Sequence, residues 1–334
     1  MRNSLYFIAL SFILLSCASN KPAQKAGIKP ANLVRTTSST VKPPIKHDVQ
    51  GDYYTVNIAD GSKNDNTVSY GSIVTAKPEK YKVVRTFFPA LAQNFRQKYL
   101  IFHYTALDND KSATVLSQKE VSAHYLVNDK DDKEIYQLVD ENKRAYHAGI
   151  SAWRNDKNLN DTSIGIEIVN LGYTVDASGK KIFAPFSDDQ IKKVAALAKD
   201  IVNRYMIPPT NVLAHSDIAP SRKQDPGPNF PWKKLYDQYQ IGMWYDEATK
   251  QSFLSATTPE VLSTQMTDIN FIFKVQNFLH SFGYDLALSG SWDAPTQRTL
   301  EAFQCHFRPE KYDGVLDVET LAILQALLQK YSAK

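Results

Sequence analysis

Three residues that lie far apart in the sequence are of types that bind metal ions. His103 lies in the apolar run YLIFHYTA, and His215 and Asp225 lie in the proline-rich stretch AHSDIAPSRKQDPGPNFP. Two histidines and one carboxylate are a common ligand set for catalytic zinc, and they leave a fourth coordination position for water. We therefore predict that His103, His215 and Asp225 converge on one Zn²⁺ per chain.

A further carboxylate, Glu167, lies within the apolar run SIGIEIVN. Burying an unpaired carboxylate is costly, so this residue either forms a salt bridge, lies at a solvated edge, or acts as a base beside a metal, where Gly165 would leave room. Lys223 precedes Asp225 by two residues, so both side chains project to one side of an extended segment. A lysine beside zinc is repelled unless a developing oxyanion lies between them. The predicted zinc site together with these two residues suits hydrolysis of a carbonyl compound, with Glu167 as general base and Lys223 as oxyanion stabiliser.

We do not expect the other histidines or the two cysteines to bind the metal. The chain has no H-E-x-x-H motif, which excludes the helix-borne zinc peptidase site. Cys17 and Cys305 have no C-x-x-C partner, so neither a disulfide framework nor a cysteine zinc site is expected. The five histidines set aside are His47 in an N-terminal tether, His280 and His306 in a C-terminal unit, and His124 and His147 in the central region.

Four residues of the central region are candidates for contact with a substrate. His124 and His147 are either structural or substrate-binding, since neither ends a strand beside polar loop residues. Trp153 follows the small-residue turn YHAG, and Asn170 ends the run SIGIEIVN. We assign all four to a substrate site.

The sequence pattern predicts that a mixed α/β fold positions these residues. Residues 186–205 form an amphipathic helix that opens with a capping box of Ser187 and Gln190. Strands and helices interleave without a regular βαβ rhythm, so we expect a central mixed β-sheet flanked by helices. The expected strands are 99–104, 124–128, 134–139, 163–169 and 211–215, and short helices are expected at 114–120 and 231–239.

The first residues read as a targeting segment. Residues 1–17 combine Arg2 with an apolar core that is too short to span a bilayer. A cleaved secretory signal is one interpretation. However, the motif LLSC resembles a bacterial lipobox, and we favour lipidation of Cys17. Residue 18 is alanine, whereas an inner-membrane retention signal has aspartate at this position. This implies a periplasmic protein anchored to the inner face of a Gram-negative outer membrane. Residues 18–50 have few large apolar residues and read as a flexible tether.

Several motifs of the central region then resemble one family in order along the chain. IFHYTA, SAHYLV, HAG, NDTSIGIEIVN and HSDIAPSRKQDPGP resemble zinc-dependent N-acetylmuramoyl-L-alanine amidases of the amidase-2, AmiD-like group. The resemblance implies a fold like those of phage T7 lysozyme and peptidoglycan recognition proteins. It implies His103, His215 and Asp225 as zinc ligands, with Asp225 in place of the cysteine of the phage branch. It also implies Glu167 as base and Lys223 as oxyanion stabiliser. The bond cleaved in this family joins the lactyl carbonyl of N-acetylmuramic acid to L-alanine.

The C-terminal part reads as a separate helical unit. We expect the catalytic domain at 51–245, a polar linker at 246–267 and a three-helix bundle at 268–334, in which two turn-plus-aspartate motifs open helices. The bundle is either a plain helical cap or a wall-binding module. The segment GSWDAPTQRTLEAFQ and its neighbours resemble the peptidoglycan-binding-domain-1 family, which implies peptidoglycan or muropeptides as the partner.

Composition narrows the choice of partners. The chain has 334 residues and a formal net charge of +4, without a long basic run, which argues against nucleic acid. No obligate protein partner is evident. Three possibilities remain: a muramoyl-L-alanine amidase, a non-catalytic peptidoglycan-binding or recognition protein, and an amide hydrolase that acts on a different peptide bond. Retention of all three ligands together with Glu167 and Lys223 favours the enzyme.

Overall fold

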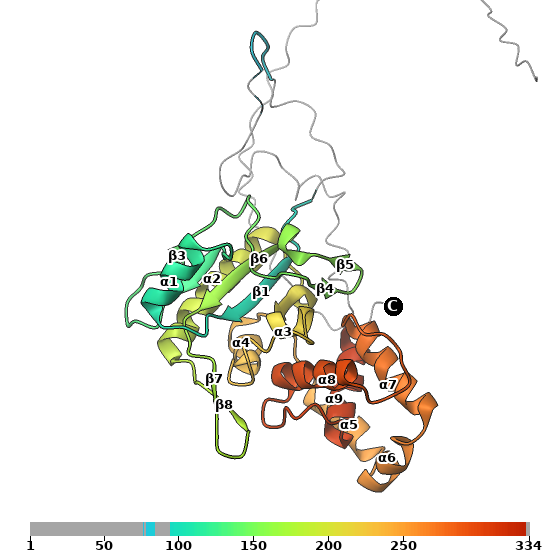
Figure 1. Ribbon diagram of the computed structural model, residues 1–334. Helices are drawn as coiled ribbons and strands as arrows, with labels where there is room; N and C mark the ends of the chain where they lie inside the picture. Colours follow the sequence, from blue (N-terminus) through green and yellow to red (C-terminus); the bar gives the residue numbers. More distant parts are fainter. Residues whose placement is uncertain (1–75, 77, 84–93, 332–334) are drawn as a thin grey trace, which may run out of the picture. The chain divides into compact units, whose positions relative to one another are not determined.

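The centre of the fold is a five-stranded β-sheet. The computed structural model describes residues 76, 78–83 and 94–331 (Figure 1). Four strands of the sheet are parallel to their neighbours, and the edge strand β3 is antiparallel to β2. The strand order is β3-β2-β6-β1-β9, with bounds Tyr99–Tyr104 for β1, Tyr125–Val127 for β2, Tyr136–Gln137 for β3, Ser163–Ile168 for β6 and Val212–Ala214 for β9.

Strands β1 and β6 lie side by side in the middle of the sheet and carry most of its apolar core. Their side chains alternate between the two faces of the sheet. Leu100, Phe102 and Ile166 are fully buried on one face, where the Phe102 ring packs on Phe230 and Trp232. The register pairs His103 with Glu167 directly across the two strands. The opposite face therefore presents these two polar residues side by side.

Helices pack against the strands of the sheet. The 18-residue helix α2, Asp188–Tyr205, packs against β1 and β2, and the Ser187 side chain caps it by accepting a hydrogen bond from the Gln190 backbone N–H, as predicted. The mixed α/β fold with helices flanking the sheet is confirmed (Figure 1). The other helices here are α1 (Asn109–Gln118), α3 (His215–Ile218) and α4 (Trp232–Tyr239).

Small strand pairs and 3-10 turns complete the central region. The hairpin β7–β8, which the sequence pattern did not reveal, projects from the sheet in Figure 1. These elements are β4 (Ala152–Trp153), β5 (Asp156–Lys157), β7 (Tyr173–Val175), β8 (Lys181–Phe183), η2 (Leu159–Asp161) and η3 (Pro209–Asn211).

The C-terminal part is helical throughout. The three helices expected after residue 268 are present as α7 (Ile269–Phe282), α8 (Ala294–Phe307) and α9 (Val318–Tyr331). The stretch 246–267, predicted as a polar linker, contains two helices that the sequence pattern did not indicate, α5 (Glu247–Ser255) and α6 (Pro259–Gln265). Helix α5 packs along α9, so tertiary contact supplies the order that its weak apolar periodicity did not indicate.

The C-terminal helices share one hydrophobic core with the sheet region. The fully buried Trp153 ring packs on Phe282 and Tyr284, and a side chain at Gly283 would come within 2.6 Å of that ring. The Arg154 backbone N–H donates to the Gly283 carbonyl at 2.7 Å. Cutting the chain before α7 would therefore expose core of the catalytic region, and would not simply remove an appendage.

The predicted targeting segment and tether lie outside the described residues. The targeting segment comprises residues 1–17, including Cys17, and the tether comprises residues 18–50. In the part of the chain that the structure describes, no helix has the length and apolar character needed to cross a bilayer.

Candidate functional site

The three predicted metal ligands lie together in the structure. The Nδ1 atoms of His103 and His215 are 2.9 Å apart, and the Oδ2 atom of Asp225 lies 3.1 Å from the first and 2.9 Å from the second. All three side chains are buried. These are the only histidine, cysteine or acidic side chains in the described residues whose potential ligand atoms cluster in this way.

Strand register brings the two histidines together. Strands β1 and β9 run parallel, and Phe102 pairs with Ala214. The residue after each of these is a predicted ligand, His103 within β1 and His215 directly after β9, because parallel strands end at the same edge of a sheet. Asp225 arrives from the following loop, and its carbonyl oxygen accepts a hydrogen bond from the Ser216 backbone N–H at 3.0 Å.

A chain of hydrogen bonds fixes the proton on His103. The Ser163 hydroxyl donates to the Leu159 carbonyl at 2.5 Å, so its oxygen is left to accept from His147 Nε2 at 3.2 Å. His147 Nδ1 is then an acceptor, and it receives the proton on His103 Nε2 at 2.9 Å. His103 Nδ1 consequently carries a lone pair that points at the ligand cluster. Burial lowers the pKa of His103 to about 4, which keeps the ring neutral.

The proton on His215 is fixed in the same sense. Its Nε2 lies 3.2 Å from the Ala148 carbonyl, which can only accept, so in the neutral ring Nδ1 carries the lone pair. Two nitrogen lone pairs and a carboxylate oxygen thus face one point with no hydrogen between them. A tetrahedral zinc with bonds of about 2.0–2.1 Å places its ligand atoms about 3.3 Å apart, close to the separations seen here. The donor set therefore fits a zinc ion.

Glu167 lies beside this cluster with a free carboxylate oxygen. Its Oε2 atom is buried and has no hydrogen-bond partner among the described residues. Burial raises the pKa of Glu167 to about 8, and the nearby Asp225 charge adds to the effect while Lys223 opposes it. An unpartnered buried carboxylate next to a ligand set favours the base interpretation over a structural salt bridge.

Gly165 makes room for His147. A Cβ atom at this position would lie 2.4 Å from the His147 ring. From the sequence we expected Gly165 to leave room beside Glu167 instead. His147 is buried and hydrogen-bonded to His103, so it supports a ligand. An isolated glycine inside a strand was the available signal, because it marks a close approach of another group.

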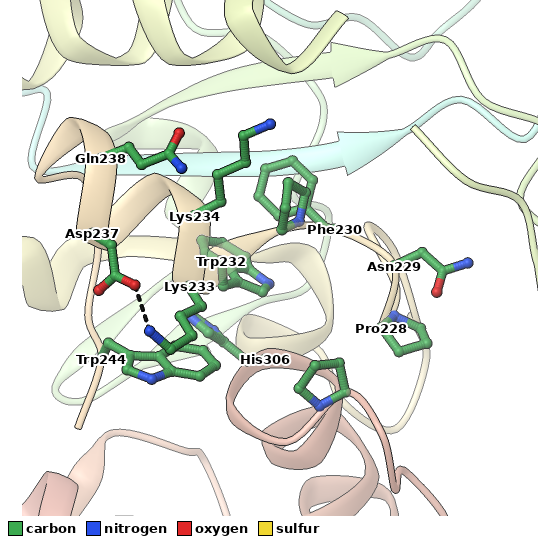
Figure 2. A pocket seen from close by; sticks show the side chains of 12 residues that line it. Pro228, Asn229, Phe230, Trp232, Lys233, Lys234, Asp237, Gln238, Trp244 and His306 are labelled. Atoms are coloured by element: carbon green, nitrogen blue, oxygen red, sulfur yellow. Dashed lines mark hydrogen bonds and ion pairs between the residues drawn. The ribbon is translucent and has the colours of Figure 1, made fainter. Parts of the chain in front are cut away.

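A cavity of about 230 Å³ opens onto the cluster. Its lining includes Glu167, His215, Lys223 and Asp225, together with residues of α1 and of the loop after β1. Lys223 is half-buried and shares this cavity with Glu167, as an oxyanion stabiliser must. A larger cavity of about 430 Å³ lies beside α4 and includes none of these residues (Figure 2).

Of the four residues assigned to a substrate site, only His147 lines the cavity, and it also bonds to His103. His124 is fully buried, with Nδ1 accepting from the Gly165 N–H and Nε2 bonded to the Lys143 carbonyl. Trp153 is fully buried and donates to the Thr210 carbonyl. Asn170 is buried and bonded to backbone groups at Gly172, Ala184 and Pro185. The contacts of His124, Trp153 and Asn170 are with the fold around the site, and none of the three lines the cavity.

Comparison with protein families matches two parts of the chain. Residues 93–228 match the family described as N-acetylmuramoyl-L-alanine amidase, and residues 270–324 match a peptidoglycan binding domain. Among curated proteins, the chain is 46% identical over 243 residues to the N-acetylmuramoyl-L-alanine amidase AmiD of Escherichia coli strain K12. That alignment covers 71% of this chain and 84% of AmiD.

Two solved structures resemble the chain over most of its described length. One is the complex of E. coli AmiD with the substrate anhydro-N-acetylmuramic acid-L-Ala-D-gamma-Glu-L-Lys, with a TM-score of 0.69 at 44% identity, covering 77% of this chain and 98% of that one. The other is AmpDh3 from Pseudomonas aeruginosa in complex with anhydromuramic pentapeptide, with a TM-score of 0.62 at 40% identity, covering 78% and 100%.

Proposed function

Because the chain belongs to the N-acetylmuramoyl-L-alanine amidase family, we propose that it is a zinc enzyme that cleaves the amide between N-acetylmuramic acid and the L-alanine of a peptidoglycan stem peptide. The family resemblance found in the motifs is confirmed. The observation that carries the proposal is the convergence of two Nδ1 atoms and one carboxylate oxygen beside Glu167, whose Oε2 has no partner among the described residues.

His103, His215 and Asp225 hold the metal in this proposal. A zinc ion held by these residues would polarise a carbonyl group and would lower the pKa of water to about 7. The protein contributes the fixed direction of the ligands. His147 and the Ala148 carbonyl each hold the Nε2 proton of one ligand histidine, which prevents the ring from turning its other nitrogen to the metal.

Glu167 and Lys223 carry the proton and charge steps. Glu167 accepts a proton from the attacking water at the unpartnered Oε2 and passes it to the leaving nitrogen of L-alanine. The Lys223 ammonium lies across the same cavity and stabilises the negative charge that develops on the carbonyl oxygen. A non-catalytic recognition protein would have no use for this pair.

The substrate class follows from the relatives whose structures hold ligands. Both carry an anhydromuramic acid with a peptide attached. We infer that muropeptides of this kind, with the normal or the 1,6-anhydro sugar, are substrates here.

The activity is tested by mass spectrometry of muropeptide digests. The full chain should release intact stem peptides that begin with L-alanine, together with free muramic acid sugars, and a chelator should abolish the release until zinc is added back. Cleavage within the peptide, or release that a chelator leaves unchanged, would contradict the proposal.

We further propose that Cys17 carries the lipid anchor and that the C-terminal helices bind the wall. An amidase of peptidoglycan works in the periplasm or at the cell wall, and a lipid on Cys17 would hold it at the inner face of the outer membrane. A Cys17→Ser variant should then move from the membrane fraction to the soluble periplasm. Unchanged fractionation would refute the anchor without affecting the catalytic proposal.

A further inference from the structure

Asp217 is a buried carboxylate that the proposed mechanism does not use. It lies in the four-residue helix α3, two residues after the ligand His215, and its side chain is fully buried. A charge in this position is costly unless several donors surround it. The donors that contact Asp217 therefore bear on the turn that carries His215.

Two of the three donors to Asp217 come from the C-terminal helical region. Oδ1 accepts from the Tyr284 hydroxyl at 2.8 Å, and Oδ2 accepts from His306 Nδ1 at 2.7 Å. The third donor is the Ala214 backbone N–H, at 2.8 Å from Oδ2. Ala214 immediately precedes His215, so the same carboxylate oxygen joins the start of the ligand turn to the C-terminal helix α8.

The His306 ring is held rigidly for this contact. It stacks between Trp232, with ring centroids 3.8 Å apart, and Phe307, at 3.9 Å, and Figure 2 shows it beside Trp232. Its Nδ1 faces Oδ2 of Asp217 at 2.7 Å, whereas its Nε2 is buried and has no partner among the described residues.

We propose that Tyr284 and His306 are positioning residues for the metal centre, through which the C-terminal helices fix Asp217 and with it the turn that presents His215. The inference depends on the proposed zinc site. Helix α3 is too short to hold its own conformation, since isolated helices below about 12–15 residues are marginal in water. The C-terminal region is thus part of the scaffold of the catalytic site, in addition to any contact that it makes with the wall.

Zinc affinity of the full chain, measured by competition with a chromophoric chelator, tests this proposal. Tyr284→Phe removes one oxygen atom, and His306→Phe keeps a stacked ring but removes the donor. Each should weaken zinc binding by about 10-fold or more, the usual cost of losing a group that orients a ligand. His306→Asn retains an N–H donor near the Nδ1 position and should recover part of the affinity.

Tyr331→Phe is the matched control. Tyr331 is also a buried C-terminal tyrosine whose hydroxyl bonds to the catalytic region, but it contacts the Trp244 backbone and not Asp217. This variant should bind zinc as tightly as the parent chain even if its melting temperature falls. If Tyr284→Phe lowers the melting temperature as Tyr331→Phe does and leaves zinc affinity at the parental value, Tyr284 is merely structural and the inference is wrong.

The remaining outcomes are separable. A parent chain that binds no zinc refutes the proposed function itself, whatever the variants do. If His306→Phe does not fold, Tyr284→Phe decides the question alone, because deleting one hydroxyl leaves the ring contacts with Trp153 and Phe282 in place.

Discussion

Replacing Glu167 with glutamine should lower kcat/KM for a soluble muropeptide by about 100-fold or more, while the protein still binds one zinc ion. The substitution keeps the shape of the side chain but removes the base, and general acid–base catalysis contributes about 10²–10⁴-fold. Because Glu167 is not one of the three clustered ligands, zinc should remain bound. Zinc content by atomic absorption and initial rates on the same preparation check both parts.

Glu134→Gln is the matched control for Glu167→Gln. Glu134 is an exposed carboxylate in the loop between β2 and β3, on the edge of the same sheet, so its replacement should leave turnover at the parental value. Zinc-loaded Glu167→Gln protein that turns over as fast as the parent chain would remove Glu167 from the mechanism.

Loss of the carboxylate ligand should have the other large effect. Asp225→Ala removes one of three donors and leaves two histidine nitrogens. Loss of a residue that only supports a ligand lowers metal affinity by about 10–100-fold, so loss of Asp225 itself should lower zinc affinity further. Activity should fall to background at zinc concentrations that saturate the parent chain. Titration of zinc into metal-free protein, followed by calorimetry and by turnover, measures both effects.

Asp225→Cys separates loss of a ligand from damage to the loop. A thiolate binds zinc with bonds of about 2.3 Å, so this variant should recover zinc binding that alanine loses. If the alanine variant binds zinc as tightly as the parent chain, Asp225 is not a ligand and the site must be reassigned.

Local sequence patterns could predict those site residues that lie on a strand or directly after one. Alternation of apolar residues identified β1 and β6, and a histidine at the end of one and a glutamate within the other marked them as chemical. The strand before His215 and the proline-rich loop with Asp225 supplied the remaining ligands. Strand patterns cannot give the pairing partner, however, so only the structure shows that His103 and Glu167 are neighbours in register.

The roles that sequence analysis could not predict are those that depend on distant contacts. His147 supports His103 from 44 positions away, and Tyr284 and His306 reach Asp217 from 67 and 89 positions away. No local periodicity carries that information. The same limit explains the missed helix α5, whose order comes from packing on α9.

The most direct test of the metal centre is anomalous X-ray scattering from crystals of the zinc-loaded protein, measured on both sides of the zinc absorption edge. If these residues bind zinc, we expect one strong peak at bonding distance from Nδ1 of His103, Nδ1 of His215 and a carboxylate oxygen of Asp225. Crystals of a preparation that cleaves muropeptides but shows no peak at these three atoms would contradict it.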